Sequence, residues 1–281
     1  MQDVVLGTIK NYDWPEIAPF ANSLHRSGFS GDKVMFVENI TLAAQEKLTA
    51  LGWQLKQVAA DSTQSYATAR HLPVRDFLFE NRNGYRFALY VDVRDAVFQS
   101  DPSAWLEAHL APAELVGPSE CICIGDQDVN SRWIRETMGE EVEKWLAGYE
   151  VLCCGTIIGR IRAVAEVVAE MCVKSNFLSG WGYDQAYFNY LVRIPPLQAV
   201  TRVLKMREGF IATCSWFLSE PWKWAPYLVD EVPIFDRERV LVCAPGTEVP
   251  FSILHQYDRD PWWKAAIESK YSEQWPVDSE Q

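Results

Sequence analysis

The stretch YRFALYVDVRDAVFQSDP, residues 85–102, decides the fold class that this chain is expected to have. Its residues 87–91 form a short, continuous apolar run, which is typical of a strand buried on both faces of a sheet. The run ends at Asp92, and Asp95 follows it closely. Because the carboxyl ends of strands line the ligand crevice in open α/β sheets, this acidic loop is a candidate site for a divalent cation and a diphosphate.

The same loop also has a purely structural interpretation. Aspartate is common wherever a strand stops, so Asp92 and Asp95 could serve only as turn and cap residues. Further along, Asp101 and Pro102 predict the start of a helix, with aspartate as the N-cap and proline in the first helical position. This limits the acidic segment to one tight loop, but the stretch alone leaves both interpretations open.

The residues before this stretch predict an alternation of strands and helices. Apolar segments rich in β-branched residues predict strands at residues 4–9, 34–37 and 55–58. Helical spacing of apolar residues predicts helices at residues 14–24, 41–51 and 67–79. Such a β-α-β-α-β order predicts a mostly parallel sheet flanked by helices, an α/β fold. No internal repeat, linker or change of composition divides the chain, so we expect a single large domain.

Composition narrows the classes of partner. The 281 residues are 48% hydrophobic, which is enough for a large core. The 26 basic and 38 acidic side chains give a net charge of −12, which opposes a broad electrostatic contact with nucleic acid or anionic lipid. Any phosphate group must therefore be held locally. The sequence has no apolar run long enough to span a membrane and no secretory pattern at its start, so we expect a cytoplasmic protein. The seven cysteines match no zinc module and are expected to be mostly buried.

Four features of the chain resemble one family when taken in order. They are the loop Asp92-Val93-Arg94-Asp95, the segment CGTIIG at residues 154–159, the pair Asp184-Gln185 with Asn189, and His255-Gln256-Tyr257. No single one of them is specific, but their joint order resembles the GT-A glycosyltransferases, in particular the family 8-like and nucleotide-diphospho-sugar transferase groups. The resemblance spans about residues 4–263 and is weakest between 195 and 249.

The resemblance implies a domain organisation. It predicts a GT-A, Rossmann-like domain over residues 1–263, with a mixed, mostly parallel sheet. Residues 1–110 would form the nucleotide-binding half, and residues 111–263 would form the half that binds the donor sugar and the acceptor. Residues 264–281 are predicted to be a polar C-terminal tail.

The resemblance also implies a metal site. Asp92, Asp95 and His255 would hold Mn²⁺ or Mg²⁺, since hard cations prefer carboxylate oxygens with at most an imidazole beside them. A lone histidine after a strand has structural roles as well. The sequence departs from the family's usual Asp-x-Asp pattern, because Arg94 stands where the second aspartate is common. Two alternatives therefore stay open: Asp92 could orient the ribose while Asp95 binds the metal, or Arg94 could itself neutralise phosphate and lessen the need for metal.

Other residues receive roles from the same resemblance. Thr8, Asn11 and Tyr12 would contact the base, and Arg70 or Arg75 would reach the diphosphate. Gly155 and Thr156 would let the donor sugar lie against the backbone, and Asp184 and Gln185 would lie near the anomeric carbon. Each group has a structural alternative. Thr8, Asn11 and Tyr12 could form an ordinary βα loop, and the two arginines could lie on a solvated helix face. Gly155 and Thr156 could serve helix–strand packing, and Asp184 could be a helix cap.

The implied function is transfer of a sugar from a nucleotide-diphosphate donor to a hydroxyl of a glycan or other acceptor, assisted by a divalent metal. The resemblance favours retention of configuration. One alternative is a sugar nucleotidyltransferase, which should carry a glycine-rich phosphate loop with a basic residue after the first strand. This part of the sequence offers only Gly7 and Lys10, which argues against that alternative. The other is a catalytically degenerate sugar- or nucleotide-binding protein in which the variation at Arg94 has abolished metal binding.

Overall fold

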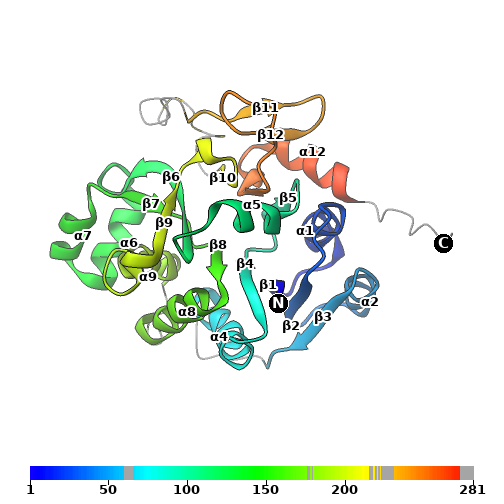
Figure 1. The fold of residues 1–281 in the computed structure, drawn as a ribbon, viewed down its shortest axis with the longest axis horizontal. Helices are drawn as coiled ribbons and strands as arrows, with labels where there is room; N and C mark the ends of the chain where they lie inside the picture. The colour runs from blue at the N-terminus through cyan, green and yellow to red at the C-terminus, as the bar shows by residue number, and fades with distance from the viewer. Residues whose placement is uncertain are drawn as a thin grey trace.

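A computed structural model describes residues 1–59, 66–175, 178, 180–214, 218, 220, 222 and 231–272 of the chain. Its centre is a sheet with the strand order β3-β2-β1-β4-β8-β6-β7, in which β9 also pairs with β6 (Figure 1). The strands are β1 (Gln2–Lys10), β2 (Asp32–Glu38), β3 (Trp53–Gln57), β4 (Tyr85–Val91), β6 (Leu115–Cys123), β7 (Glu150–Leu152), β8 (Thr156–Arg160) and β9 (Thr201–Leu204). Strands β1 to β4 are parallel, whereas β8 is antiparallel to both β4 and β6. The mixed α/β sheet predicted from the sequence is confirmed.

Helices cover both faces of this sheet (Figure 1). One face carries α1 (Trp14–Arg26), α2 (Leu42–Ala50) and α5 (Pro102–His109), and the other carries α4 (His71–Glu80), α8 (Ile161–Ser175) and α9 (Tyr183–Leu191). Strand β4 shows why its apolar run is continuous. Phe87, Leu89 and Val91 pack into the core on the α1 side, while Ala88 and Tyr90 pack into the core on the α4 side. Both faces of β4 are buried, as predicted.

Two smaller sheets lie beside the large one (Figure 1). Strands β10 (Ile211–Thr213), β13 (Ile253–His255) and β5 (Ala96–Phe98) form the first, and β11 (Ile234–Asp236) with β12 (Leu241–Cys243) forms the second. The other elements of the described residues are α3 (Tyr66–Ala69), α6 (Asp128–Met138), α7 (Glu140–Leu146), α10 (Leu197–Val200), α12 (Pro261–Ser272), η1 (Ile124–Asp126), η2 (Met206–Glu208) and η4 (Tyr257–Arg259). Strand β5, which the sequence did not predict, begins directly after Asp95 and pairs with β13 so that His255 lies opposite Ala96.

The helix predicted over residues 67–79 is interrupted. It is divided into α3 and α4, with Arg70 at the junction. Pro73 supplies the physical reason, because proline has no N–H to donate to the carbonyl of Ala69 and its ring crowds that carbonyl. As a consequence, Arg70 lies at a helix junction beside the loop that follows β4.

The polar tail predicted over residues 264–281 is helical as far as Ser272. Helix α12 places Trp263, Ile267 and Tyr271 on one buried stripe with a spacing of four residues. The backbone carbonyl of Tyr271 accepts a hydrogen bond of 2.7 Å from the side chain of Asn22 in α1. Residues 264–272 therefore belong to the folded core, while residues 273–281 lie outside the described residues. The division of the domain near residue 110 stays a prediction.

This packing gives a test of stability. Ile267→Ala should lower the free energy of unfolding by about 2–5 kcal/mol, because it removes a buried side chain and leaves a cavity. The exposed residue Ser269 on the same helix offers a control, and Ser269→Ala should change stability by less than about 0.5 kcal/mol. Urea unfolding followed by circular dichroism measures both values. If the two variants were equally stable, α12 would not be part of the cooperative core.

The cysteines and the lengths of the helices were the subject of two expectations from the sequence. Six of the seven cysteines are buried and the seventh, Cys123, is half-buried, and all are free thiols. In the described part of the chain, no helix has both the length and the apolar character that crossing a bilayer requires.

Candidate functional site

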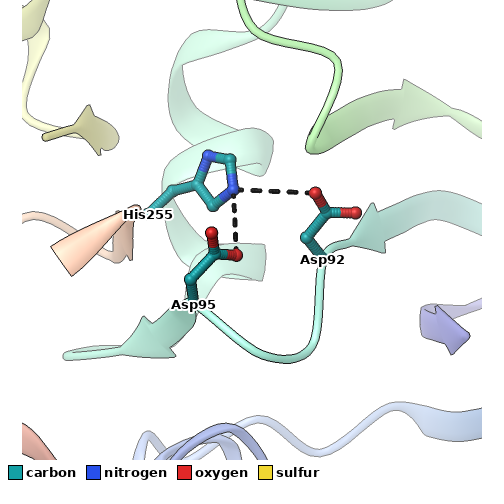
Figure 2. A group of neighbouring side chains, drawn as sticks. All are labelled: Asp92, Asp95 and His255. Carbon is teal, nitrogen blue, oxygen red and sulfur yellow. Dashed lines mark ion pairs between the residues drawn. The ribbon is translucent and has the colours of Figure 1, made fainter. Parts of the chain in front are cut away.

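Asp92, Asp95 and His255 lie together at the end of β4 (Figure 2). His255 Nε2 is 3.4 Å from Asp95 Oδ1 and 3.9 Å from Asp92 Oδ2. The ligand atoms that the three residues offer lie within 4.8 Å of one another. Pairing of β5 with β13 produces this arrangement, because the last residue of β13 is held opposite the residue that follows Asp95.

The three side chains suit a hard divalent cation. Two carboxylates and one imidazole form a common donor set for Mn²⁺ or Mg²⁺. The buried Nε2 of His255 makes no hydrogen bond with a described residue and lies within ion-pair distance of both carboxylates, so the neutral imidazole could bind a cation through this nitrogen. Gly155 borders the same space, and a Cβ there would lie 2.3 Å from His255 Cε1 and 2.8 Å from Asp92 Oδ2. A glycine is therefore needed to keep the space between the three residues clear.

The charges of this cluster are balanced locally. Burial opposes ionisation of Asp95, but His255, Arg259 and Arg94 together lower the pKa of its carboxyl group below the usual range. Burial likewise opposes a charge on His255, while the neighbouring Cys153 and Asp95 raise the pKa of its imidazole. The Cys153 sulfur lies 3.5 Å from Nδ1, on the opposite side of the ring from the carboxylates. Asp95 is thus held as an anion.

Three arginines from different elements lie around the acidic residues. Arg70 is ion-paired with Asp92, and its second terminal nitrogen lies 3.0 Å from Asp184. Arg94 and Arg259 lie 3.7 Å and 3.5 Å from the Asp95 carboxylate. Guanidinium groups bind phosphate oxygens well, so this side of the site can accept a diphosphate.

Asp184 is a buried, ionised carboxylate at the start of α9. One of its oxygens accepts hydrogen bonds from Arg70 and from His71 Nε2, the latter at 3.3 Å. The other oxygen accepts from the backbone N–H of Gln185 at 2.9 Å. Burial opposes the charge, yet His71 and Arg70 keep the pKa of Asp184 below its usual range. His71 was not among the residues singled out from the sequence, and its position directly after Arg70 was the signal that could have indicated a role.

The side-chain amide of Gln185 is fixed by hydrogen bonds on both sides. Its oxygen accepts from the backbone N–H of Cys154 at 3.3 Å. Its nitrogen donates to Asn130 at 2.8 Å and to Glu120 at 3.3 Å. Gln185 therefore presents one defined face to the site. The sequence did not reveal Glu120 or Asn130, since they reach Gln185 only through tertiary packing.

A cavity of about 400 Å³ connects these groups. Its lining includes ten of the residues predicted from the sequence: Thr8, Tyr12, Arg70, Asp92, Arg94, Asp95, Gly155, Asp184, Gln185 and His255. It also includes residues to which the sequence assigned no individual role: Tyr66, Ala67, Val93, Glu120, Gln127, Val129, Asn130, Trp133, Cys153, Cys154, Trp181, Gly182, Gln256 and Arg259. The structure thus gathers most of the predicted site around one hollow.

Three predicted residues do not line the cavity. The side chain of Asn11 accepts a hydrogen bond of 2.6 Å from Asn39 on the surface. Arg75 is ion-paired with its neighbour Asp76 on an outer part of α4. Thr156 is completely buried within β8. The structure does not bring these three side chains to the site.

The overall fold is similar to that of solved glycosyltransferase structures. LgtC, described as a galactosyltransferase in complex with donor and acceptor sugar analogues, superimposes with a TM-score of 0.56 over 98% of both chains. The present chain has the GT-A glycosyltransferase fold. The sequence identity to LgtC is 11%, so this likeness concerns the fold.

Two other solved structures have the same GT-A fold. The bifunctional glycosyltransferase WbbM gives a TM-score of 0.57 at 13% identity, with 96% of this chain covered. The glycosyltransferase GlyE of Streptococcus pneumoniae TIGR4 gives 0.55 at 14% identity, with 100% covered. The chain spans about half the length of WbbM and 66% of GlyE. No protein-family model and no curated protein sequence matches the chain.

Proposed function

We propose that this protein transfers a sugar from a nucleotide-diphosphate donor to an acceptor hydroxyl with the help of Mn²⁺ or Mg²⁺. The observation that carries the proposal is the meeting of Asp92, Asp95 and His255 beside Gly155, at the carboxyl end of β4 in a GT-A sheet. These three residues would hold the cation. When bound, the cation supplies Lewis-acid stabilisation of the negative charge that develops on the leaving diphosphate.

The remaining side chains have distinct tasks in this proposal. Arg94 and Arg259 would bind diphosphate oxygens on the open side of Asp95. Thr8 and Tyr12, which line the cavity after β1, would contact the nucleoside. The Asp184 carboxylate would accept a hydrogen bond from a hydroxyl of the donor sugar, and the fixed amide of Gln185 would lie near the anomeric carbon. Arg70 couples the two carboxylates of Asp92 and Asp184, so the donor's phosphate and sugar ends are oriented together.

In the proposed transfer, one bond to the anomeric carbon of the donor sugar forms and another breaks. The acceptor oxygen forms a bond to the anomeric carbon, and the bond from that carbon to the phosphate oxygen breaks. The electron pair leaves with the nucleoside diphosphate, and the hydroxyl proton passes to a phosphate oxygen. We expect retention of configuration, as the family resemblance favours, and ¹H NMR of the fresh product would show the anomer directly.

The convergence of the three ligands also bears on the degenerate-protein alternative. Loss of metal binding at the Asp92-Val93-Arg94-Asp95 loop would predict a scattered donor set. The space beside Gly155 and the position of His255 Nε2 near both carboxylates instead support a working site.

A screen of nucleotide sugars tests the proposal. Each donor is incubated with the protein and Mn²⁺, and released nucleoside diphosphate is measured with and without EDTA. We expect release from at least one donor, abolished by EDTA. If the protein neither binds nor cleaves any donor in the presence of metal, the proposal is wrong.

Asp184→Asn should separate turnover from nucleotide binding. The substitution keeps the shape of the side chain and removes its charge, so turnover should fall by about 100-fold, as for the loss of other preorganised polar groups. Affinity for the nucleoside diphosphate, measured by calorimetry, should change by less than about threefold. Asp76→Asn is the matched control, because Asp76 is also paired with an arginine but lies outside the cavity. Equal turnover in the two variants would remove Asp184 from the proposed mechanism.

A further inference from the structure

One wall of the cavity is formed by two tryptophans. Trp133 belongs to α6, and Trp181 precedes α9 by two residues. Their ring centroids are 5.2 Å apart and the ring planes meet at 72°, which creates an aromatic corner. Trp181 is 74% exposed, an unusual state for the largest apolar side chain, and both rings line the same cavity as Asp184.

Neighbouring contacts hold this corner in place. Gly182 has a φ of +82°, and a Cβ on it would lie 2.3 Å from the Trp133 ring. The indole of Trp133 therefore packs directly on the backbone that carries Trp181. The hydroxyl of Tyr183 donates a hydrogen bond of 3.1 Å to Glu136 in α6, which connects the two elements a second time. Trp181 is thus presented by a supported turn, although its ring contributes little to the core.

The arginines of the cavity lie beside its acidic residues. Among the described lining residues the arginines are Arg70, Arg94 and Arg259, and all of them contact carboxylates of the cluster or of Asp184. The corner instead adjoins the amides of Gln127 and Asn130, which hydrogen-bond to each other at 3.2 Å. The surroundings of the corner therefore offer flat apolar rings and amide groups, with the Glu120 carboxylate bound to Gln185, whereas each arginine of the described lining is paired with a carboxylate.

We propose that Trp133 and Trp181 form the acceptor subsite and that the acceptor is a neutral carbohydrate. A pyranose ring has an apolar C–H face that packs on an indole and a rim of hydroxyls that amide groups can bind, so it matches both kinds of surface. The inference rests on the proposed function, because it takes the transfer to occur beside Asp184 and Gln185. A lipid acceptor would require a longer apolar channel, and a short peptide hydroxyl would not need two large rings.

Saturation-transfer NMR tests the subsite. The probes are methyl β-D-glucopyranoside, methyl β-D-galactopyranoside, lactose and maltose, each added to the full chain with UDP or GDP and Mn²⁺. At least one sugar should receive saturation on its ring protons, and Trp181→Ala should reduce that signal at least fivefold. Trp181→Phe should retain a substantial part of it. Trp145→Ala is the control, because Trp145 is also a partly exposed tryptophan but does not line the cavity.

The outcomes separate this inference from the proposed function. Metal-dependent nucleotide binding, measured by calorimetry on the same samples, should be unchanged within twofold in Trp181→Ala. If the nucleotide binds but no sugar does, or if Trp181→Ala binds sugar as well as the wild type, the acceptor inference is overturned while the proposed function stands. Saturation of a serine- and threonine-containing peptide in place of the sugars would also overturn it. Failure of the wild type to bind any nucleotide would contradict the proposed function itself.

Discussion

Asp95→Asn is expected to reduce metal-dependent release of nucleoside diphosphate by at least about 100-fold. Asp95 is more buried than Asp92, the other carboxylate of the cluster. It is held as an anion by His255, Arg259 and Arg94. The amide has nearly the same shape but offers a neutral oxygen, which is a much poorer ligand for a hard cation. Loss of electrostatic stabilisation at a reacting centre commonly reduces turnover by this amount. Mn²⁺ affinity should fall at least about tenfold, as measured by calorimetry.

Asp258→Asn provides the matched control for this variant. Asp258 lies 3.7 Å from Arg94 and is also ion-paired with Arg259, so it shares two of the cationic partners of Asp95 without belonging to the metal cluster. Its turnover should stay within about threefold of the wild type. Circular dichroism on both variants shows whether they are folded at the assay temperature. Unchanged Mn²⁺ affinity in folded Asp95→Asn would mean that the ligands are wrongly assigned.

Gly155→Ala should disable the site with the addition of a single methyl group. A Cβ at this position would meet His255 at 2.3 Å and Asp92 at 2.8 Å, and contacts this short force the side chains apart. Since metal ligands must be held to within a few tenths of an ångström, we expect at least a 100-fold loss of metal-dependent turnover. The backbone at Gly155 does not have a positive φ, so the expected damage comes from the contacts of the methyl group.

Gly148→Ala is the appropriate comparison. A Cβ at Gly148 would have no heavy atom within 4 Å, and the residue also lacks a positive φ. This variant should retain wild-type turnover. If Gly155→Ala were as active as Gly148→Ala, the space between Asp92 and His255 would not be the place where the donor's phosphates and the cation meet.

Local patterns were sufficient to predict much of the fold. The continuous apolar run ending at Asp92 predicted a doubly buried central strand, and β4 is buried on both faces. Asp101 was correctly predicted to cap α5, and the helix predicted from residue 41 is α2, which Thr41 caps. These signals are local, because a strand's burial and a helix's cap depend on residues that are close in sequence.

The parts that were not predicted depend on long-range pairing. Strand β5 has only three residues and no periodic pattern, yet its pairing with β13 is what holds His255 beside Asp95. Glu120 and Asn130 reach Gln185 across 65 and 55 residues of sequence. Their partners are set by how strands and helices pack in the tertiary structure, which spacing along the chain does not reveal.

Arg70 and Arg75 illustrate the same limit within one helical segment. Both were candidates for contact with a diphosphate, and their residue types and predicted helix are the same. Pro73 breaks that helix and leaves Arg70 at a junction next to Asp92, whereas Arg75 pairs with Asp76 away from the cavity. The break, rather than the residue type, decides which arginine lines the site.

Calorimetric titration of UDP and GDP into the wild-type protein, once with Mn²⁺ and once with EDTA, tests the central claim most directly. The claim is that the loop carrying Asp92 and Asp95 and the distant end of β13 at His255 converge to hold a cation that binds the donor's diphosphate. We predict that at least one of the two nucleotides binds at least about tenfold more tightly with Mn²⁺ than with EDTA. Equal affinity under the two conditions, or no binding under either, would contradict the account.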